Sequence, residues 1–359
     1  MQIEMEIKRI KIKELSELIY SEWYKNSEHL PISPERVISQ IHNPFAHSED
    51  EVLYLLLKDN ILVAYRLVLP SYVGDQKMAW LSCVWVHPNH RRKGYGVQLT
   101  KLALEFWNNK MLGTNFTPES RTMYQDKLHF STSTILKGNR YYNQLYLSEL
   151  LPKKKPILRW IKPILLTVDF IGNQYLKRKK KINIDSQISI QRLEFIDKES
   201  LEFIAPYQTK EQSSRTKEEW DWIVKYPWVV QGSQNSISKR YHFSNRSNSF
   251  DFHLYKVFKN KNLIGCLWIT IHDGFLKTPY LYFKKENTNY ILKLIIKLAQ
   301  ENNVKAITTF DVNLNQLMTQ EKKYFYHQKS ITRHFLSSKG LKISNERFFK
   351  EGDGDSVFT

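Results

Sequence analysis

Residues 81–106 read LSCVWVHPNHRRKGYGVQLTKLALEF and contain three consecutive patterns. The run 81–86 is β-branched and aromatic, which predicts a strand covered on both faces, and His87-Pro88 ends it. Apolar residues then recur at helical spacing over 95–106, so one side of a helix should pack against a sheet. These residues therefore predict a strand, a turn and a helix in that order.

The turn, RRKGYG at 91–96, is basic and carries two glycines. Gly94 and Gly96 have no Cβ, so the backbone can turn tightly and approach a ligand. The N–H groups of a first helical turn have no partner within the helix. A helix start of this kind beside three cations favours a polyanion such as a pyrophosphate.

Two well-known glycine motifs do not fit this turn. A dinucleotide-binding fingerprint requires a two-residue glycine spacing, and a Walker A loop requires Gly-Lys-Ser/Thr. Two glycines alone are common in strand-to-helix turns for steric reasons. The whole arrangement is more specific, because Val-x-Val-His-Pro ends the strand and Arg-x-x-Gly-x-Gly opens the helix. It resembles the acetyl-coenzyme-A motif of the GCN5-related N-acetyltransferase (GNAT) superfamily.

The elements predicted before the motif agree with this resemblance. Alternation of apolar and charged residues over 3–7 predicts a strand, and two helices follow it. Three further strands are predicted, at 52–57, 61–69 and 78–86. This is the order in which the GNAT fold begins.

After the motif come a strand at 111–116 and a short helix at 119–128. The resemblance covers about residues 1–150 and implies an α/β (α+β) fold, a mixed central sheet flanked by helices. In that fold the fourth and fifth strands splay apart and admit the pantetheine arm. The final strands would contain Tyr141, Tyr142, Leu145 and Leu147.

The resemblance also assigns a cofactor site. In the GNAT family, backbone amides of the fourth strand hold the pantetheine and the acetyl carbonyl, and amides at the helix start hold the pyrophosphate. The matching strand residues are Val84, Trp85 and Val86. The matching turn residues are Arg91, Arg92, Lys93, Gly94, Tyr95, Gly96 and Val97. Asn115 is expected to hydrogen-bond the pantetheine.

Tyr124 matches a tyrosine that the family commonly places near the coenzyme sulfur, and it is the expected general acid. A phenol with a pKa near 10 is protonated at neutral pH and can donate. Two alternatives stay open: Tyr124 is a core aromatic, and Asn115 is a strand-end turn residue. The family often has a glutamate base on the fourth strand, but residues 78–86 contain no carboxylate. The remaining choices are Glu22, Asp75, Glu119 or a proton relayed by water.

From about residue 184 the sequence resembles its own first half. Residues 190–193 correspond to 7–10, and the hairpin at 260–265 corresponds to 58–64 if a polar surface loop was inserted before it. A second, divergent copy of the same fold in tandem is therefore predicted.

The second copy lacks the pyrophosphate turn. Residues 282–289, YFKKENTN, contain no glycine, so close approach to a phosphate is not expected there. We predict three parts: a GNAT-like catalytic domain at 1–150, a connector at 151–183 and a divergent GNAT-like domain at 184–359.

The formal net charge is +18, and half of it falls on residues 151–181, where ten cations face one anion (ten minus one, +9). Apolar and aromatic residues occupy 157–175 between two cationic ends. As a helix this segment could lie on an anionic membrane or attract nucleic acid. We favour a connector whose apolar residues pack on the two domains.

Composition excludes several classes of protein. The chain is 42% hydrophobic and can bury real cores, but no apolar run approaches the roughly 20 residues that span a bilayer. The charged N-terminus shows no secretory signal, and Cys83 and Cys266 stand in separate runs, so a cytoplasmic protein without disulfides is expected. No metal site is predicted. The acidic run 351–355 lacks the other ligands of a calcium loop and is expected to be a turn before a short strand.

The sequence therefore predicts an N-acetyltransferase that takes acetyl-CoA as co-substrate and transfers acetyl to a primary amine by direct attack. The nearest alternative is a Fem-like aminoacyltransferase, because those proteins also pair two such folds and residues 151–181 could attract aminoacyl-tRNA. The third is a non-catalytic membrane or nucleic-acid adaptor.

Overall fold

The computed structural model describes residues 5–179, 182–183 and 185–358. Residues 3 and 4 of the predicted first strand, and Lys180 and Lys181 of the basic segment, lie outside this description. Among the described residues, no helix is both long enough and apolar enough to cross a membrane.

The chain forms two compact units that are not consecutive in sequence. Unit 1 comprises Met1–Leu136, Ala205–Phe250 and Arg333–Thr359, and unit 2 comprises Lys137–Ile204 and Asp251–Thr332. The boundaries between them fall inside four elements: β6 (Ser131–Tyr142), α8 (Lys198–Gln208), β10 (Phe250–Lys259) and β14 (His327–Ser337).

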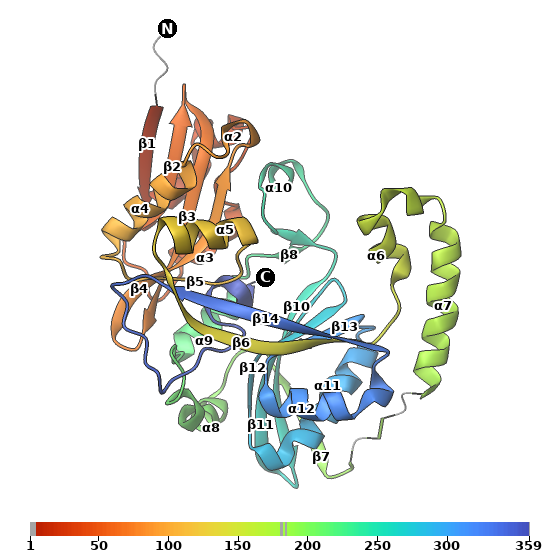
Figure 1. The fold of residues 1–359 in the computed structure, drawn as a ribbon. Coiled ribbons are helices and arrows are strands. Elements are labelled where there is room, and N and C mark those ends of the chain that lie inside the picture. The colour runs from red at the N-terminus through yellow and green to blue at the C-terminus, as the bar shows by residue number, and fades with distance from the viewer. Residues whose placement is uncertain (1–4, 180–181, 184, 359) are drawn as a thin grey trace. The chain divides into compact units, whose positions relative to one another are not determined.

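The sheet of unit 1 has the order β1-β2-β3-β4-β5-β14. Strands β1 to β4 are antiparallel neighbours, β5 runs parallel to β4, and β14 is antiparallel to β5. Helix α4 covers β2, β3 and β4 (Figure 1). The strands are β1 (Met5–Lys11), β2 (Glu51–Lys58), β3 (Ile61–Val73), β4 (Gln76–Val86) and β5 (Met111–Gly113). The helices are α1 (Leu15–Tyr20), α2 (Glu22–Asn26), α3 (Pro34–Ile41), α4 (Tyr95–Phe106), α5 (Pro118–Thr122), α9 (Lys217–Lys225) and α10 (Ser236–Arg240). The short strands β8 (Val230–Gln231) and β9 (Arg246–Ser247) pair with each other.

The sheet of unit 2 repeats this plan with the order β6-β13-β12-β11-β10-β7. The pair β12–β13 is parallel, as β4–β5 is, and the other registered pairs are antiparallel. The strands not yet bounded are β7 (Ile188–Leu193), β11 (Asn262–His272), β12 (Phe275–Phe283) and β13 (Ala306–Thr309). The helices are α6 (Leu147–Lys154), α7 (Lys162–Lys179), α11 (Thr288–Glu301) and α12 (Val312–Gln320).

The repeated plan confirms a mixed sheet flanked by helices in two tandem copies. In each copy a buried strand leads through a turn into a helix and then into a parallel neighbour: β4, α4 and β5 in the first, and β12, α11 and β13 in the second. The sixth place in each sheet is taken by a strand from the other copy, since β14 pairs with β5 and β6 pairs with β13. The two compact units are therefore not the same segments as the two sequence copies. The boundaries predicted for the copies, near residues 150 and 184, stay a prediction.

Some local predictions were wrong. Leu145 and Leu147 do not belong to a strand, because the Asp169 carboxylate accepts hydrogen bonds from the amides of Leu147 and Ser148, at 2.8 and 2.9 Å, and caps α6 there. The predicted strand at 111–116 ends at Gly113.

Two further elements differ from the prediction. The predicted helix at 119–128 is split into α5 and a π-turn at Met123–Lys127, closed by a 2.9 Å hydrogen bond from the Phe130 amide to the Tyr124 carbonyl. Up to Phe358, the last described residue, no strand follows 351–355, and a 3₁₀ turn forms at Gly354–Phe358.

Candidate functional site

The bend between β4 and α4 is open. Gly94 takes a left-handed conformation (φ +83°) as the N-cap of α4, and a Cβ built there would meet no atom within 4 Å. Arg92 is also left-handed, with φ +64°. Residues 91–94 are all exposed. Gly96 is buried instead, because its backbone packs against Met123 and Val84, whose side-chain atoms would lie 3.3 and 3.6 Å from an added Cβ.

The main-chain donors of this bend are mostly unused. The first hydrogen bond of α4 runs from the Gln98 amide to the Gly94 carbonyl, at 2.9 Å. The Arg91 amide donates to the Pro88 carbonyl at 3.4 Å. In this described part of the chain, the amides of residues 92–97 have no hydrogen-bond acceptor. Six of the seven predicted donors therefore have no partner within the protein, and those of residues 92–94 belong to exposed residues.

Three cationic side chains surround these amides. Arg91 Nε donates to the Val86 carbonyl at 3.3 Å, which ties its side chain to the end of β4. Arg92 and Lys93 extend into solvent. The positive side chains and the positive end of the α4 dipole thus both attract an anion to the bend.

Strands β4 and β5 part beside this bend. Their ladder joins Ala79 to Met111 and ends at Leu81–Gly113, whereas β4 continues for five residues to Val86. On its other edge β4 stays paired with β3 through the predicted residues: Arg66–Val84, Tyr65–Trp85 and Ala64–Val86. Residues 82–86 of β4 therefore have no pairing with β5 on the side that faces it. An extended ligand that binds along β4 needs such an unpaired edge.

Asn115 lies just beyond the parting strands. It is exposed and left-handed, with φ +53°, and its backbone turn follows the end of β5. Its position beside the β4–β5 split fits both earlier interpretations, a turn residue and a ligand contact.

Tyr124 is buried and hydrogen-bonded to an arginine that the sequence analysis missed. Arg66 Nη2 donates to Tyr124 Oη at 2.9 Å, and Arg66 is fully buried on β3. The same guanidinium donates to Thr100 Oγ1 on α4 at 3.1 Å and to the Ser82 carbonyl on β4 at 3.4 Å. Because the Tyr124 oxygen accepts from Arg66, its own proton is left for another acceptor.

A sequence signal for Arg66 existed. It is the one charged residue within the run 61–73, and a charge inside a buried strand must find polar partners. The three carboxylates considered as bases fit a catalytic role poorly, because Glu22, Asp75 and Glu119 are all exposed.

Trp85 lies on the other face of the sheet among histidines. Its ring stacks on His242 with centroids 4.6 Å apart, and His29 lies 4.9 Å from both rings. Burial lowers the pKa of His242, and the neighbouring His29, Arg91 and His87 lower it further. Among the described residues, no group of three His, Cys, Asp or Glu side chains could hold a metal ion.

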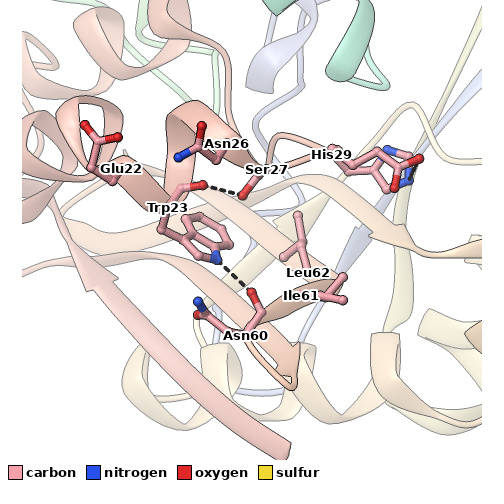
Figure 2. A pocket seen from close by; sticks show the side chains of 9 residues that line it. Glu22, Trp23, Asn26, Ser27, His29, Asn60, Ile61 and Leu62 are labelled. Atoms are coloured by element: carbon pink, nitrogen blue, oxygen red, sulfur yellow. Dashed lines mark hydrogen bonds and ion pairs between the residues drawn. The ribbon is translucent and has the colours of Figure 1, made fainter.

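His29 also closes one side of a pocket of about 500 Å³ beside the β2–β3 turn. Figure 2 shows Trp23 and Asn60 joined across it by the indole hydrogen bond to the Asn60 carbonyl, at 2.9 Å. The rim carries Glu22 and Glu28, opposite in charge to the basic bend.

Comparison with known proteins gives one family match and several similar folds. The acetyltransferase (GNAT) family model matches residues 12–130. No curated protein matches the chain. The Saccharomyces cerevisiae N-myristoyltransferase with bound myristoyl-CoA is similar over 95% of this chain and 83% of its own, at 12% identity and a TM-score of 0.52. At this identity the similarity is one of fold.

Two other solved structures resemble the chain over most of its length. A tandem GNAT protein from the clavulanic acid biosynthesis pathway has 12% identity, coverage of 95% of this chain and 100% of its own, and a TM-score of 0.49. A putative acetyltransferase from Pyrococcus horikoshii has 13% identity, coverage of 98% and 96%, and a TM-score of 0.48.

Proposed function

Because the GNAT family model matches residues 12–130, we propose that this chain transfers an acyl group from acyl-CoA to an amine, with acetyl as the first candidate. The observation that carries the proposal is the open bend at residues 92–97, where six free amides meet three cations beside the parting strands β4 and β5.

In this proposal the diphosphate of coenzyme A rests on the amides of the bend. Backbone N–H groups at a helix N-terminus bind phosphate without a side chain between them, and Gly94 leaves that approach clear. The side chains of Arg91, Arg92 and Lys93 add attraction that salt should weaken. The pantetheine then follows the unpaired edge of β4 past Val86 and Val84 to the end of the β5 ladder.

The chemistry would occur near residue 82, where β4 and β5 separate. A neutral amine attacks the thioester carbonyl, the C–N bond forms, and the C–S bond breaks. Tyr124 gives its proton to the leaving thiolate, and Arg66 holds the phenol oxygen at 2.9 Å.

A thiol-release assay tests the proposal. The purified protein is given acetyl-CoA, a medium-chain acyl-CoA or myristoyl-CoA with a panel of primary amines, and free CoA thiol is measured. We expect release that requires both the thioester and an amine. Absence of release with every acyl-CoA, together with transfer from aminoacyl-tRNA, would instead establish the Fem-like alternative.

A further inference from the structure

The connection between α6 and α7 exposes apolar side chains. Trp160 is 89% exposed and Ile157 is 77% exposed, and Ile161 and Ile164 are exposed as well. One exposed aliphatic residue is ordinary, but several close together mark an interaction surface. These four side chains are exposed whereas Leu165 of the same connector is buried, so the packing of the connector on the two domains stays a prediction.

Five cations lie among them: Lys153, Lys154, Lys155, Arg159 and Lys162, all exposed. None of these five forms an ion pair with a described residue. Two acidic residues of α6 and α7 are already engaged: Glu149 pairs with Lys305, and the buried Asp169 carboxylate accepts hydrogen bonds from the amides of Leu147 and Ser148. We call these five cations, with Ile157, Trp160, Ile161 and Ile164, the α6–α7 tip.

The fold holds the tip in place. Helices α6 and α7 lie side by side (Figure 1). Asn173 on α7 binds both backbone groups of Leu145, at 2.8 and 2.9 Å. Gly172 permits this approach, because a Cβ there would lie 2.3 Å from Leu145 Cδ1. The side of α7 that carries Leu165 and Asp169 is buried by this packing.

The outward side of α7 continues the apolar surface. Ile164, Val168, Ile171 and Tyr175 are spaced i, i+4, i+7 and i+11, which places them on one face, and all four are exposed. An apolar helix face that starts from a tryptophan and a lysine cluster has the composition of an interfacial membrane element.

We propose that the α6–α7 tip docks this protein on the surface of an anionic lipid bilayer. The lysines and arginine meet the lipid phosphates, Trp160 lies at the headgroup level, and the isoleucines enter the acyl boundary. The contact is interfacial, since no described helix could cross a membrane.

Charge and shape disfavour the other occupants. A second copy of the chain, related by twofold symmetry through the tip, would bring five cations against five identical cations. Nucleic acid would neutralise the cations but would leave four aliphatic and aromatic side chains with little to bury them, because the isoleucines cannot stack on bases. An anionic lipid surface neutralises the cations and also buries the apolar side chains.

Vesicle flotation of the full chain tests the proposal. We expect binding to phosphatidylcholine vesicles that contain about one third phosphatidylglycerol, and none to phosphatidylcholine alone. Replacing Lys153, Lys154 and Lys155 by Gln should weaken binding about 100-fold. Trp160→Ser with Ile157→Ser should weaken it at least about tenfold. Val312→Ser is the matched control, because Val312 is 76% exposed outside the tip and should leave binding unchanged.

Three outcomes would overturn the proposal. The first is no binding to anionic vesicles. The second is binding that survives both tip variants. The third is a tip-dependent complex with RNA or with a second copy in the absence of vesicle binding, measured by filter binding and sedimentation velocity.

A separate observation concerns the missing base and rests on the proposed function. Ser82 is the first residue of β4 beyond the β5 ladder, and its Oγ donates to Asp355 Oδ2 at 2.8 Å. The neighbouring Gly354 packs against Trp80 on β4 and Thr114 just after β5, since an added Cβ would lie 3.1 and 3.2 Å from their side chains. The turn at Gly354–Phe358 therefore brings a carboxylate to a strand that has none of its own.

This turn is firmly anchored in unit 1. Phe358 is buried and stacks on Trp228 with ring centroids 4.7 Å apart. Arg333 Nη1 donates to Ser356 Oγ at 2.9 Å. Asp355 itself is half-buried between the buried residues Gly354 and Ser356, and the hydrogen bond from Ser82 holds its carboxylate in place.

We infer that Asp355 is the general base that takes the proton of the attacking amine. The amine nitrogen bonds to the thioester carbon, its proton passes to Asp355, and the thiolate that leaves takes a proton from Tyr124. Burial raises the pKa of Asp355, and Arg36 on α3, the hydrogen bond from Ser82 and Arg333 on β14 oppose that rise. Arg36 also donates a hydrogen bond, from Nη1, to the Cys83 sulfur on β4 at 3.2 Å.

The pH profile of turnover tests this role. Asp355→Asn should lower kcat about 100-fold or more and remove the ascending limb, while CoA affinity is retained. Ser82→Ala should move that limb to higher pH, because the carboxylate loses a donor. Asp50→Asn removes a buried carboxylate elsewhere in unit 1 and should leave the profile unchanged.

Failure of the general-base proposal can be distinguished from failure of the proposed function. An active wild-type protein whose profile is the same in Asp355→Asn and Ser82→Ala would overturn the base and leave the transferase standing. A wild-type protein that transfers no acyl group would overturn the proposed function itself.

Discussion

Tyr124→Phe separates a structural role of the Tyr124 hydroxyl from a chemical one. The substitution removes an acceptor 2.9 Å from the fully buried Arg66 guanidinium, which would keep Thr100 Oγ1 and the Ser82 carbonyl. A buried donor left without an acceptor costs about 1–3 kcal/mol, so the free energy of unfolding should fall by that amount. If Tyr124 is also the general acid, kcat should fall by about 100-fold to 10,000-fold.

Thr100→Val is the matched control for this prediction. It removes another acceptor of the same guanidinium, at 3.1 Å, so a similar loss of stability is expected. Its kcat should change far less, because Thr100 supplies no proton to the thiolate. Urea unfolding gives the stability, and thiol release gives kcat. Equal losses of kcat in the two variants, or full activity in Tyr124→Phe, would refute the reasoning.

Two further predictions concern stability. Burial raises the pKa of Glu219 to about 7 against the pull of Arg215, and Asp353 adds to the rise. The pKa of Glu219 is higher in the folded protein than in the unfolded chain, so the free energy of unfolding should fall by about 3 kcal/mol as pH rises from about 4.5 past 7. Urea titrations at several pH values measure this fall, and Glu219→Gln should flatten it. Gly340→Ala should cost about 1–3 kcal/mol in the same assay, because its Cβ would lie 2.5 Å from the Asn109 carbonyl oxygen; unchanged stability would contradict that packing.

The motif was predictable because its information is local. The change from a buried apolar run to helical spacing lies within 26 consecutive residues of the sequence, and β4 and α4 occur there with boundaries close to those predicted. The open conformation of Gly94 follows from a residue type that accepts positive φ without strain. The tandem plan was predictable for the same reason, since each copy repeats the order of local patterns.

The exchange of β6 and β14 was not predictable from local patterns. Which strand fills the last place in a sheet depends on pairing between residues more than 200 positions apart, such as Leu336 with Gly113. Periodicity indicates that a strand exists and leaves its neighbour undetermined. The consecutive division of the chain therefore did not anticipate the interleaved compact units.

The same limit applied to Arg66 and Asp355. Their importance comes from partners at Tyr124 and Ser82, which lie 58 and 273 residues away in the sequence. The acidic run at 351–355 offered only a weak likeness to a metal loop. Similarly, the sequence showed that residues 157–175 are largely apolar but not that Trp160 and Ile164 are exposed while Leu165 is buried.

The open bend is the central claim, and calorimetric titration with coenzyme A tests it most directly. Gly94→Trp would cover the six amides, whereas Gly74→Trp places the same side chain at another exposed, left-handed glycine in the β3–β4 turn. The account predicts that wild type and Gly74→Trp bind coenzyme A alike and that Gly94→Trp binds at least about tenfold more weakly. Absence of binding by the wild type, or equal affinity in all three proteins, would contradict it.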